Sequence, residues 1–199
     1  MTALPRSFYE RDARMVAPEL LGKVLVCGKT AGRIVEVEAY CGSEDPGSHA
    51  FRGLTPRNAV MFGPPGRLYV YRSYGMHWCA NAVCQAEGVA DAVLIRALAP
   101  VVGIDAMRVA RAQGQRHPVT DRDLCRGPGR LCQALGITGG HNGADLVTGD
   151  LGVTVMEDGT LPPVAPGVSV RVGLTKGAEH PWRFFITGDR HVSGPGRAA

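Results

Sequence analysis

The chain has 199 residues, of which 45% are hydrophobic and 20% charged, the usual composition of a globular protein with a core. No apolar run approaches the roughly 18 residues that span a bilayer, and the first residues lack the apolar segment of a secretory signal. These features argue against a membrane protein and a secreted one. We therefore expect a monomeric single domain over residues 1–199 in the cytoplasm, without membrane contact and with a frayed tail at about residues 190–199.

The six cysteines show no pattern of a disulfide framework or a metal site, because none of them forms a C-x-x-C pair. With no secretory signal and no ligand spacing, free thiols are favoured, and we expect neither a metal nor a cofactor. The positions are Cys27, Cys41, Cys79, Cys84, Cys125 and Cys132.

The net charge is +4, and 19 of the 22 basic residues are arginines. Guanidinium groups bind phosphate bidentately, so this choice is typical of a polyanion-binding face. A GC-rich coding sequence would produce the same bias. Composition leaves both interpretations open.

Before residue 100 the pattern predicts one helix, several strands and a long loop. Ser7 and Glu10 have capping-box spacing at the start of an apolar helical pattern that Pro18 interrupts. Alternation and turn residues predict the strands, and a long Gly-, Pro- and Ser-rich loop of this kind tends to be functional. The expected strands are 23–28 and 33–40 around a turn at 29–32, a hairpin of 67–73 and 76–85, and 91–98, with the loop over 41–67.

Beyond residue 100 two helices and two closing strands are predicted. An amphipathic pattern over 100–114, with Val109 on its apolar face, predicts a helix closed by Gly114. A shorter helix is expected over 127–137, with Pro128 near its first turn and Gly136 after its end. Residues 138–167 predict loops and short strands, followed by strands at 168–174 and 182–188. The fold class is α+β, a mainly antiparallel sheet with a few helices.

Glu36, Glu38 and Tyr40 alternate onto one face of the strand at 33–40. Two like charges on one face repel each other unless they are solvated or paired. Pattern alone favours a solvated face, since half-buried strands show such alternation. The functional alternative is that one glutamate is a general base held on a rigid strand.

His49 stands alone in the long loop, and general considerations favour an ordinary surface residue over catalysis. A neutral imidazole can nevertheless donate one hydrogen bond and accept another, which suits recognition of a base edge.

The hairpin has three of the five tyrosines, and Tyr69 and Tyr71 on one strand face are explained simply by a packed core. Tyr74, beside Gly75 at the tip, is not. Aromatic or apolar wedges on protrusions are the residues that kink DNA, so Tyr74 is a candidate wedge. Arg96, inside an apolar strand, is costly to bury without a carboxylate, and Glu38 or Glu36 is the expected partner.

Several motifs stand in one order along residues 33–84: E-A-Y, D-x-x-x-H-A, T-P-R-N-x-x-M-F and L-Y-V-Y-x-x-Y-G-M. In this combination the chain resembles the alkyladenine (3-methyladenine, methylpurine) DNA glycosylases. The segments "LLGKVLV", "GPGRLCQALGI" and "PWRFF" extend the resemblance over nearly the whole chain. It implies a curved sheet like an open barrel, similar to the C-terminal domain of formyltransferases, with a protruding hairpin.

The resemblance also implies roles for individual residues. Glu38 would activate the attacking water, and Arg96 would help to hold it. Tyr40 and Tyr71 would stack on the two faces of a flipped base. The remaining implied roles are His49 on the base edge or sugar-phosphate, Asn81 narrowing the pocket against the exocyclic amine of guanine, and Tyr74 with Met76 entering the DNA stack.

The implied activity is base-excision repair of double-stranded DNA: a monofunctional hydrolase that flips out alkylated or deaminated purines, such as 3-methyladenine, ethenoadenine and hypoxanthine, and leaves an abasic site. The motif block contains no lysine, so a Schiff-base lyase step has no candidate nucleophile. The H-x-E…P-C-x-x-C pattern of zinc deaminases is absent.

Three positions depart from the family pattern. Arg72-Ser73 is more polar than expected before the wedge, His77 stands where some members have an aromatic residue, and Phe185 where tyrosine is frequent. Two alternatives stay open: a catalytically weak protein of the same fold that binds damaged DNA, and a small-molecule hydrolase or formyltransferase-like domain. The presence of both Glu38 and Arg96 favours activity over mere binding, and the Tyr74 wedge argues against a small substrate.

Overall fold

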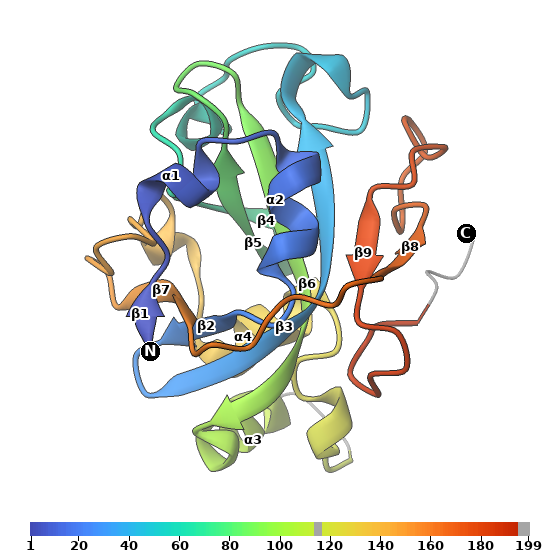
Figure 1. Ribbon diagram of the computed structural model, residues 1–199. Coiled ribbons are helices and arrows are strands. Elements are labelled where there is room, and N and C mark those ends of the chain that lie inside the picture. Colours follow the sequence, from blue (N-terminus) through green and yellow to red (C-terminus); the bar gives the residue numbers. More distant parts are fainter. Residues whose placement is uncertain (114–116, 195–199) are drawn as a thin grey trace.

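The protein is described by a computed structural model that covers residues 1–113 and 117–194. Its strands form one curved antiparallel sheet in the order β1-β7-β2-β3-β6-β5-β4, and β9 joins a free stretch of β3 and pairs with β8 (Figure 1). The strands are β1 (Thr2–Ala3), β2 (Val24–Cys27), β3 (Thr30–Cys41), β4 (Leu68–Ser73), β5 (His77–Cys84), β6 (Asp91–Val102), β7 (Val153–Glu157), β8 (Gly167–Ser169) and β9 (Arg183–Phe185).

β3 is the strand that organises this sheet. One edge pairs with β6 along its length, and the other pairs first with β2, up to Arg33, and then with β9, from Glu36. Register shifts interrupt the β3–β6 ladder on both sides of Glu36. Such bulges bend a strand and increase its twist. The sheet therefore curls near Glu36, where β9 replaces β2 as the neighbour of β3. In Figure 1, β8 and β9 lie beside the rest of the sheet.

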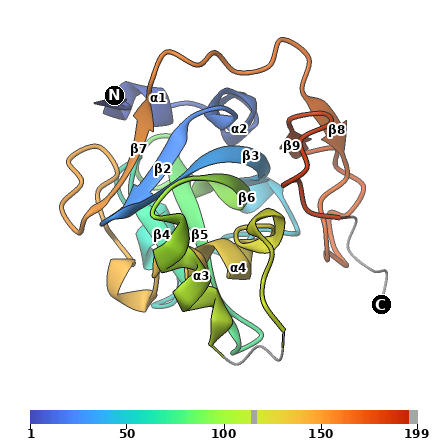
Figure 2. The ribbon, with the colours of Figure 1, turned by 90° about the horizontal axis from the view of Figure 1, so that it is seen from below.

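Helices cover both sides of the sheet. Seen from below in Figure 2, α1 and α2 lie on one side of β3 and β6, and α3 and α4 on the other. Their bounds are α1 (Arg6–Tyr9), α2 (Ala13–Leu20), α3 (Ile104–Ala112) and α4 (Pro128–Leu135). The main core lies between these layers, and Gly32 lets β3 approach β6 closely, since a Cβ there would lie 2.8 Å from Leu98 Cβ. Among the described residues no helix has the length and apolar composition needed to cross a membrane.

All six cysteines are free and buried. Burial raises the pKa of each thiol, to about 12 for Cys41 and Cys125. They behave here as small apolar side chains of the core.

The α+β class, the curved antiparallel sheet and the hairpin are confirmed. The capping box at Ser7 is wrong, because Ser7 lies within α1 and the Asp12 carboxylate caps α2 by accepting from the Arg14 amide. Pro18 does not interrupt that helix but lies inside its last turn. The turn expected at 29–32 is shorter, because Cys27 already pairs with Thr30.

Beyond residue 90 several element boundaries differ from those expected. β6 continues to Val102, so the helix expected from residue 100 begins only at Ile104 after Gly103, whose φ is 75°. Val109, which was expected on the buried apolar face of this helix, is exposed. Gly114, which was expected to end the helix, lies outside the described residues. The expected strand at 168–174 ends at Ser169, whereas α4 and the left-handed Gly136 after it are confirmed.

Candidate active site

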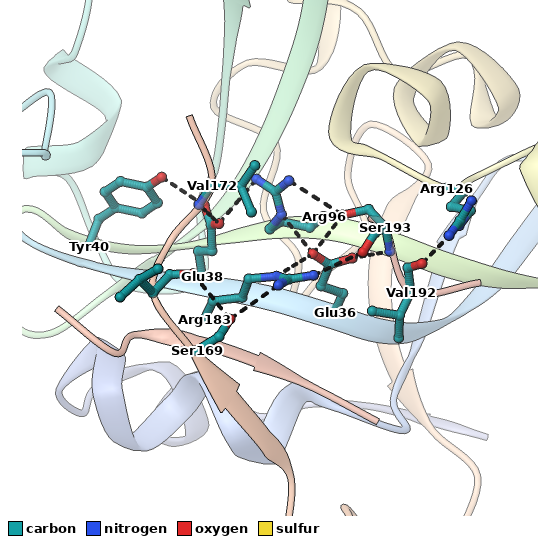
Figure 3. A network of polar contacts seen from close by, with 11 residues as sticks. Glu36, Glu38, Tyr40, Arg96, Arg126, Ser169, Val172, Arg183, Val192 and Ser193 are labelled. Carbon is teal, nitrogen blue, oxygen red and sulfur yellow. Dashed lines mark hydrogen bonds and ion pairs between the residues drawn. The ribbon is translucent and has the colours of Figure 1, made fainter. Parts of the chain in front are cut away.

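Glu36 and Glu38 share one face of β3, and both are fully buried. The interpretation of this face as solvated is therefore wrong. The two carboxylates are enclosed by the Arg183 side chain, the Val172 amide and Ser193, all distant in the sequence, so local alternation could not reveal their burial. Two cations from neighbouring strands compensate the two anions: Arg96 of β6 and Arg183 of β9 (Figure 3).

Glu38 has the more open arrangement of the two carboxylates. Its Oε1 accepts from the Val172 amide at 2.7 Å and lies 3.2 Å from Arg96 Nη1. Its Oε2 accepts from the Tyr40 hydroxyl at 2.9 Å. Burial and then the Glu38 carboxylate raise the pKa of the Tyr40 phenol well above its usual value, so Tyr40 stays a donor. A carboxylate has about four acceptor positions, so among the described residues one position on Oε2 is left for another donor.

Glu36 is saturated. Its Oε1 accepts from Arg96 Nε at 2.9 Å, Arg183 Nε at 2.8 Å and Ser193 Oγ at 2.7 Å. Its Oε2 accepts from the Ser193 amide at 2.6 Å. Charge-assisted bonds of this kind are the strong ones in a buried site. Glu36 therefore holds two guanidinium groups, those of Arg96 and Arg183.

Arg96 is the link between the two carboxylates. Burial lowers the pKa of its guanidinium, but Glu38 and Glu36 raise it by more, and the balance is a pKa above the usual value. The sequence-based expectation that Glu38 or Glu36 pairs with Arg96 is confirmed, and both do.

An aromatic pocket opens beside this network. An inner pocket of about 70 Å³ has Tyr40, His49, Tyr71 and Asn81 on its walls. It shares the three aromatic residues with an outer cleft of about 570 Å³, on whose walls Arg96 and Tyr74 also lie. The pocket thus connects the buried ion network with the hairpin.

His49 is exposed and forms part of the pocket wall. Its Nδ1 lies 3.1 Å from the Tyr69 hydroxyl, and its ring meets Tyr71 edge-on at 4.4 Å. Burial, and then the charge of Arg57, lower the pKa of its imidazole, so the ring is neutral near pH 7. Asn58 fixes the loop by donating to the His49 carbonyl at 2.9 Å. His49 is therefore a surface-exposed residue that also forms part of the pocket wall.

A buried ion pair joins the two loops that form the pocket walls. Asp45 lies in the loop of His49, and Arg171 precedes Val172 and Leu174. The two side chains are completely buried and paired bidentately, with Arg171 Nη2 donating to Asp45 Oδ1 at 2.7 Å. The Arg171 guanidinium also lies 4.5 Å from the centre of the Tyr40 ring.

The hairpin tip projects its side chains into solvent. Tyr74 is 85% exposed and has a φ of 49°, which is unusual for a residue with a side chain, and Met76 is 66% exposed. Arg72, just before the tip, lies over the Trp78 ring at 5.4 Å. The tip is therefore a protruding aromatic and apolar point flanked by a cation.

The structure brings the predicted site residues together: Tyr40, His49, Tyr71 and Asn81 lie on the walls of the inner pocket, and Arg96 and Tyr74 on those of the outer cleft. Glu38 lies on neither wall but pairs with Arg96 at 3.2 Å. Met76 lies apart from them, on a groove beside Trp78. Sequence reasoning missed Asp45, Arg171, Arg183 and Ser193. The two arginines carried a usable signal, because each interrupts a predicted apolar strand as Arg96 does.

The site thus combines a carboxylate–arginine pair, an aromatic pocket and an exposed hairpin tyrosine on a curved antiparallel sheet. The family model described as Methylpurine-DNA glycosylase (MPG) matches residues 7–190, and the chain therefore belongs to the methylpurine-DNA glycosylase family. A protein of Burkholderia lata named "Putative 3-methyladenine DNA glycosylase" is 53% identical over 96% of this chain and 91% of its own length. Proteins with the same name from Burkholderia cenocepacia and Rhodopseudomonas palustris are 52% and 50% identical, over 97% and 96% of this chain and 92% and 90% of their own lengths.

Proposed function

We propose that the protein flips alkylated or deaminated purines out of duplex DNA and hydrolyses the bond between base and sugar, leaving an abasic site. The observation that carries this proposal is the Glu38–Arg96 pair, whose arginine lies on the wall of an aromatic cleft that also includes the exposed Tyr74 of the hairpin. A base inside a duplex cannot reach a buried carboxylate, so extrusion is part of the reaction.

In the hydrolytic step, Glu38 is the general base. Its remaining acceptor position takes a proton from water, and the water oxygen bonds to C1′ of the flipped nucleotide. The bond from C1′ to the purine nitrogen breaks, and its electron pair leaves with the base. Positive charge develops on the sugar, and the anionic Glu38 stabilises it in a site that excludes bulk water. Arg96 orients Glu38 and neutralises its partner Glu36.

Base selection belongs to the pocket walls. Tyr40 and Tyr71 offer ring faces that attract an electron-poor purine, with added cation–π attraction for a cationic 3-alkylpurine. Neutral lesions are poorer leaving groups and need hydrogen bonds to the departing base. The neutral imidazole of His49 can donate one. Asn81, fixed by its bond to the Tyr69 carbonyl at 3.0 Å, limits the room for an exocyclic amine.

Tyr74 and Met76 would enter the DNA stack, and Tyr74 would fill the gap left by the flipped nucleotide. Extrusion costs a few kcal/mol, and stacking by an inserted side chain offsets part of it. The full exposure of Tyr74 supports this role, because a core residue would be covered.

A monofunctional reaction is part of the proposal. The three lysines are Lys23, Lys29 and Lys176, and none of them lies on the walls of the inner pocket or the outer cleft. Lys23 is instead paired with Glu157 at 3.2 Å. Strand cleavage should therefore need added alkali, and borohydride should trap no protein–DNA adduct.

The experiment incubates the protein with duplexes that carry hypoxanthine, 1,N6-ethenoadenine or 3-methyladenine, followed by alkaline cleavage. The parent protein should release the base from at least one lesion duplex, which alkali then cleaves, and Glu38→Gln should lose about 10²- to 10⁴-fold in rate while still binding. Glu19→Gln, a surface substitution, is the control. Binding without scission by the parent for every lesion would favour the damage-binding protein over the glycosylase. A Glu38→Gln variant of parental rate would refute the role of Glu38.

A further inference from the structure

The segment that follows β9 ends in the ion network. Ser193 uses all of its polar groups there: the amide donates to Glu36 Oε2, the hydroxyl donates to Glu36 Oε1, and the carbonyl accepts from Arg183 Nη2 at 3.0 Å. The Ser193 hydroxyl also lies 3.4 Å from Arg96 Nη2. Residues 190–193, which the sequence assigns to a frayed tail, are thus docked against the site (Figure 3).

Two further arginines hold the same segment. Arg126 Nε donates to the Val192 carbonyl at 2.8 Å, and Arg122 Nε donates to the Arg190 carbonyl at 3.1 Å. Two side chains from the segment between α3 and α4 therefore hold the backbone next to Ser193 through hydrogen bonds. These hydrogen bonds fix the backbone on which Ser193 stands, so Ser193 has a defined position beside Glu36.

Arg96 contacts both carboxylates, and its distance to Glu36 is the shorter of the two. Its Nε lies 2.9 Å from Glu36, whereas its Nη1 lies 3.2 Å from Glu38. The position of Glu36 therefore decides where Nη1 stands relative to Glu38. Ser193 supplies two of the four donors to Glu36, including the sole donor to Oε2 among the described residues.

We propose that Ser193 is a positioning residue of the active site: it fixes the Glu36 carboxylate, and through Glu36 it holds Arg96 against the catalytic Glu38. This inference rests on the proposed function. Neither Ser193 nor Glu36 touches the substrate. Without the hydroxyl, Glu36 can rotate, and Arg96 follows it away from Glu38. Groups that orient a catalytic residue through hydrogen bonds to a charged partner influence the rate and not the binding of substrate.

Ser193→Ala in the full chain tests the proposal, because it removes the hydroxyl and keeps the backbone amide. Single-turnover excision of hypoxanthine and the Kd for the same duplex are measured side by side. We expect the rate to fall about 10- to 100-fold, as befits a lost hydrogen bond to a charged group, with Kd unchanged within about twofold. Ser193→Thr, which restores the hydroxyl, should recover most of the rate.

Ser169→Ala is the matched control. Its hydroxyl accepts from Arg183 Nη1 at 3.1 Å, at the far side of Arg183 from Arg96. It should retain the parental rate. Should Ser193→Ala fail to fold, Ser193→Cys keeps the size of the side chain with a weaker donor and should show the same loss of rate without loss of binding.

Three results overturn the inference. The first is a Ser193→Ala rate equal to that of an active parent, which leaves the proposed function standing. The second is an equal loss in Ser169→Ala, or a Kd that weakens in step with the rate, since either indicates general loosening of the site. The third is a parent that releases no base from any lesion duplex, which removes the proposed function and this inference together.

Discussion

The Asp45–Arg171 pair allows a sharp prediction for Asp45→Asn. Both side chains are fully buried, and Asp45 also accepts from the Gly47 amide at 2.8 Å. Asparagine keeps one acceptor oxygen, but its amide NH₂ faces the Arg171 guanidinium and the Gly47 amide, which are themselves donors. It also leaves the Arg171 charge uncompensated. Removing one partner of a buried ion pair costs about 3–5 kcal/mol, which is a drop in melting temperature of about 6–20 °C for a chain of this size.

The assay is urea unfolding followed by tryptophan fluorescence. Trp182 is a suitable reporter, because the Arg171 guanidinium lies 5.0 Å from the centre of its ring. Glu19→Gln is the matched control: Arg11 and Glu19 form the same two-bond pair, at 3.0 and 2.8 Å, but on the surface. An exposed pair contributes at most about 1 kcal/mol, so this variant should unfold close to the parent.

The comparison isolates burial as the cause, since the geometry of the two pairs is alike. A loss below about 1 kcal/mol for Asp45→Asn, equal to that of the control, would refute the reasoning. We also expect Asp45→Asn to weaken binding of lesion duplex, because the pair joins the loop of His49 to the loop of Leu174 across the inner pocket.

Three further predictions follow. Tyr74→Ala should weaken binding of lesion duplex by about tenfold or more and leave single-strand binding unchanged in gel-shift titrations; an equal loss on both would disprove the wedge. Burial, above all, raises the pKa of Asp91 from 3.8 to about 6, so its ionised form destabilises the fold and stability falls as pH rises from about 4 to 6. Asp91→Asn should raise stability at pH 7.5 by up to about 3 kcal/mol and much less at pH 4, whereas an equal gain at both pH values contradicts this account. Gly167→Ala places a Cβ 2.3 Å from the Phe185 ring and should cost about 1–3 kcal/mol in unfolding free energy, measured with urea.

Much of the site could be predicted from the sequence because its residues lie in short motifs on one strand and one hairpin. Tyr74 stood out through its glycine neighbour, and Arg96 through the cost of burying a charge. The same cost applied to Arg171 and Arg183 and would have indicated buried partners for both.

Other features could not be predicted, because they depend on contacts between distant segments. Glu36 looks exposed in a local pattern, and it is buried only because Arg183 and Ser193, 147 and 157 residues later, cover it. Ser193 lies in a Gly- and Pro-rich run, which is typical of a loose terminus. No local feature of that run indicates that a carboxylate on β3 binds it.

The burial of every cysteine has a consequence for the chemistry the enzyme meets. The agents that alkylate DNA bases are electrophiles, and electrophiles also react with thiolates. A thiol with a pKa of about 12, such as Cys41 or Cys125, has roughly one thiolate in 10⁵ molecules at pH 7, and the chain around it keeps reagents away. The repair protein therefore presents a poor target to the agents whose damage it removes, and treatment with a thiol reagent should leave the folded protein unmodified.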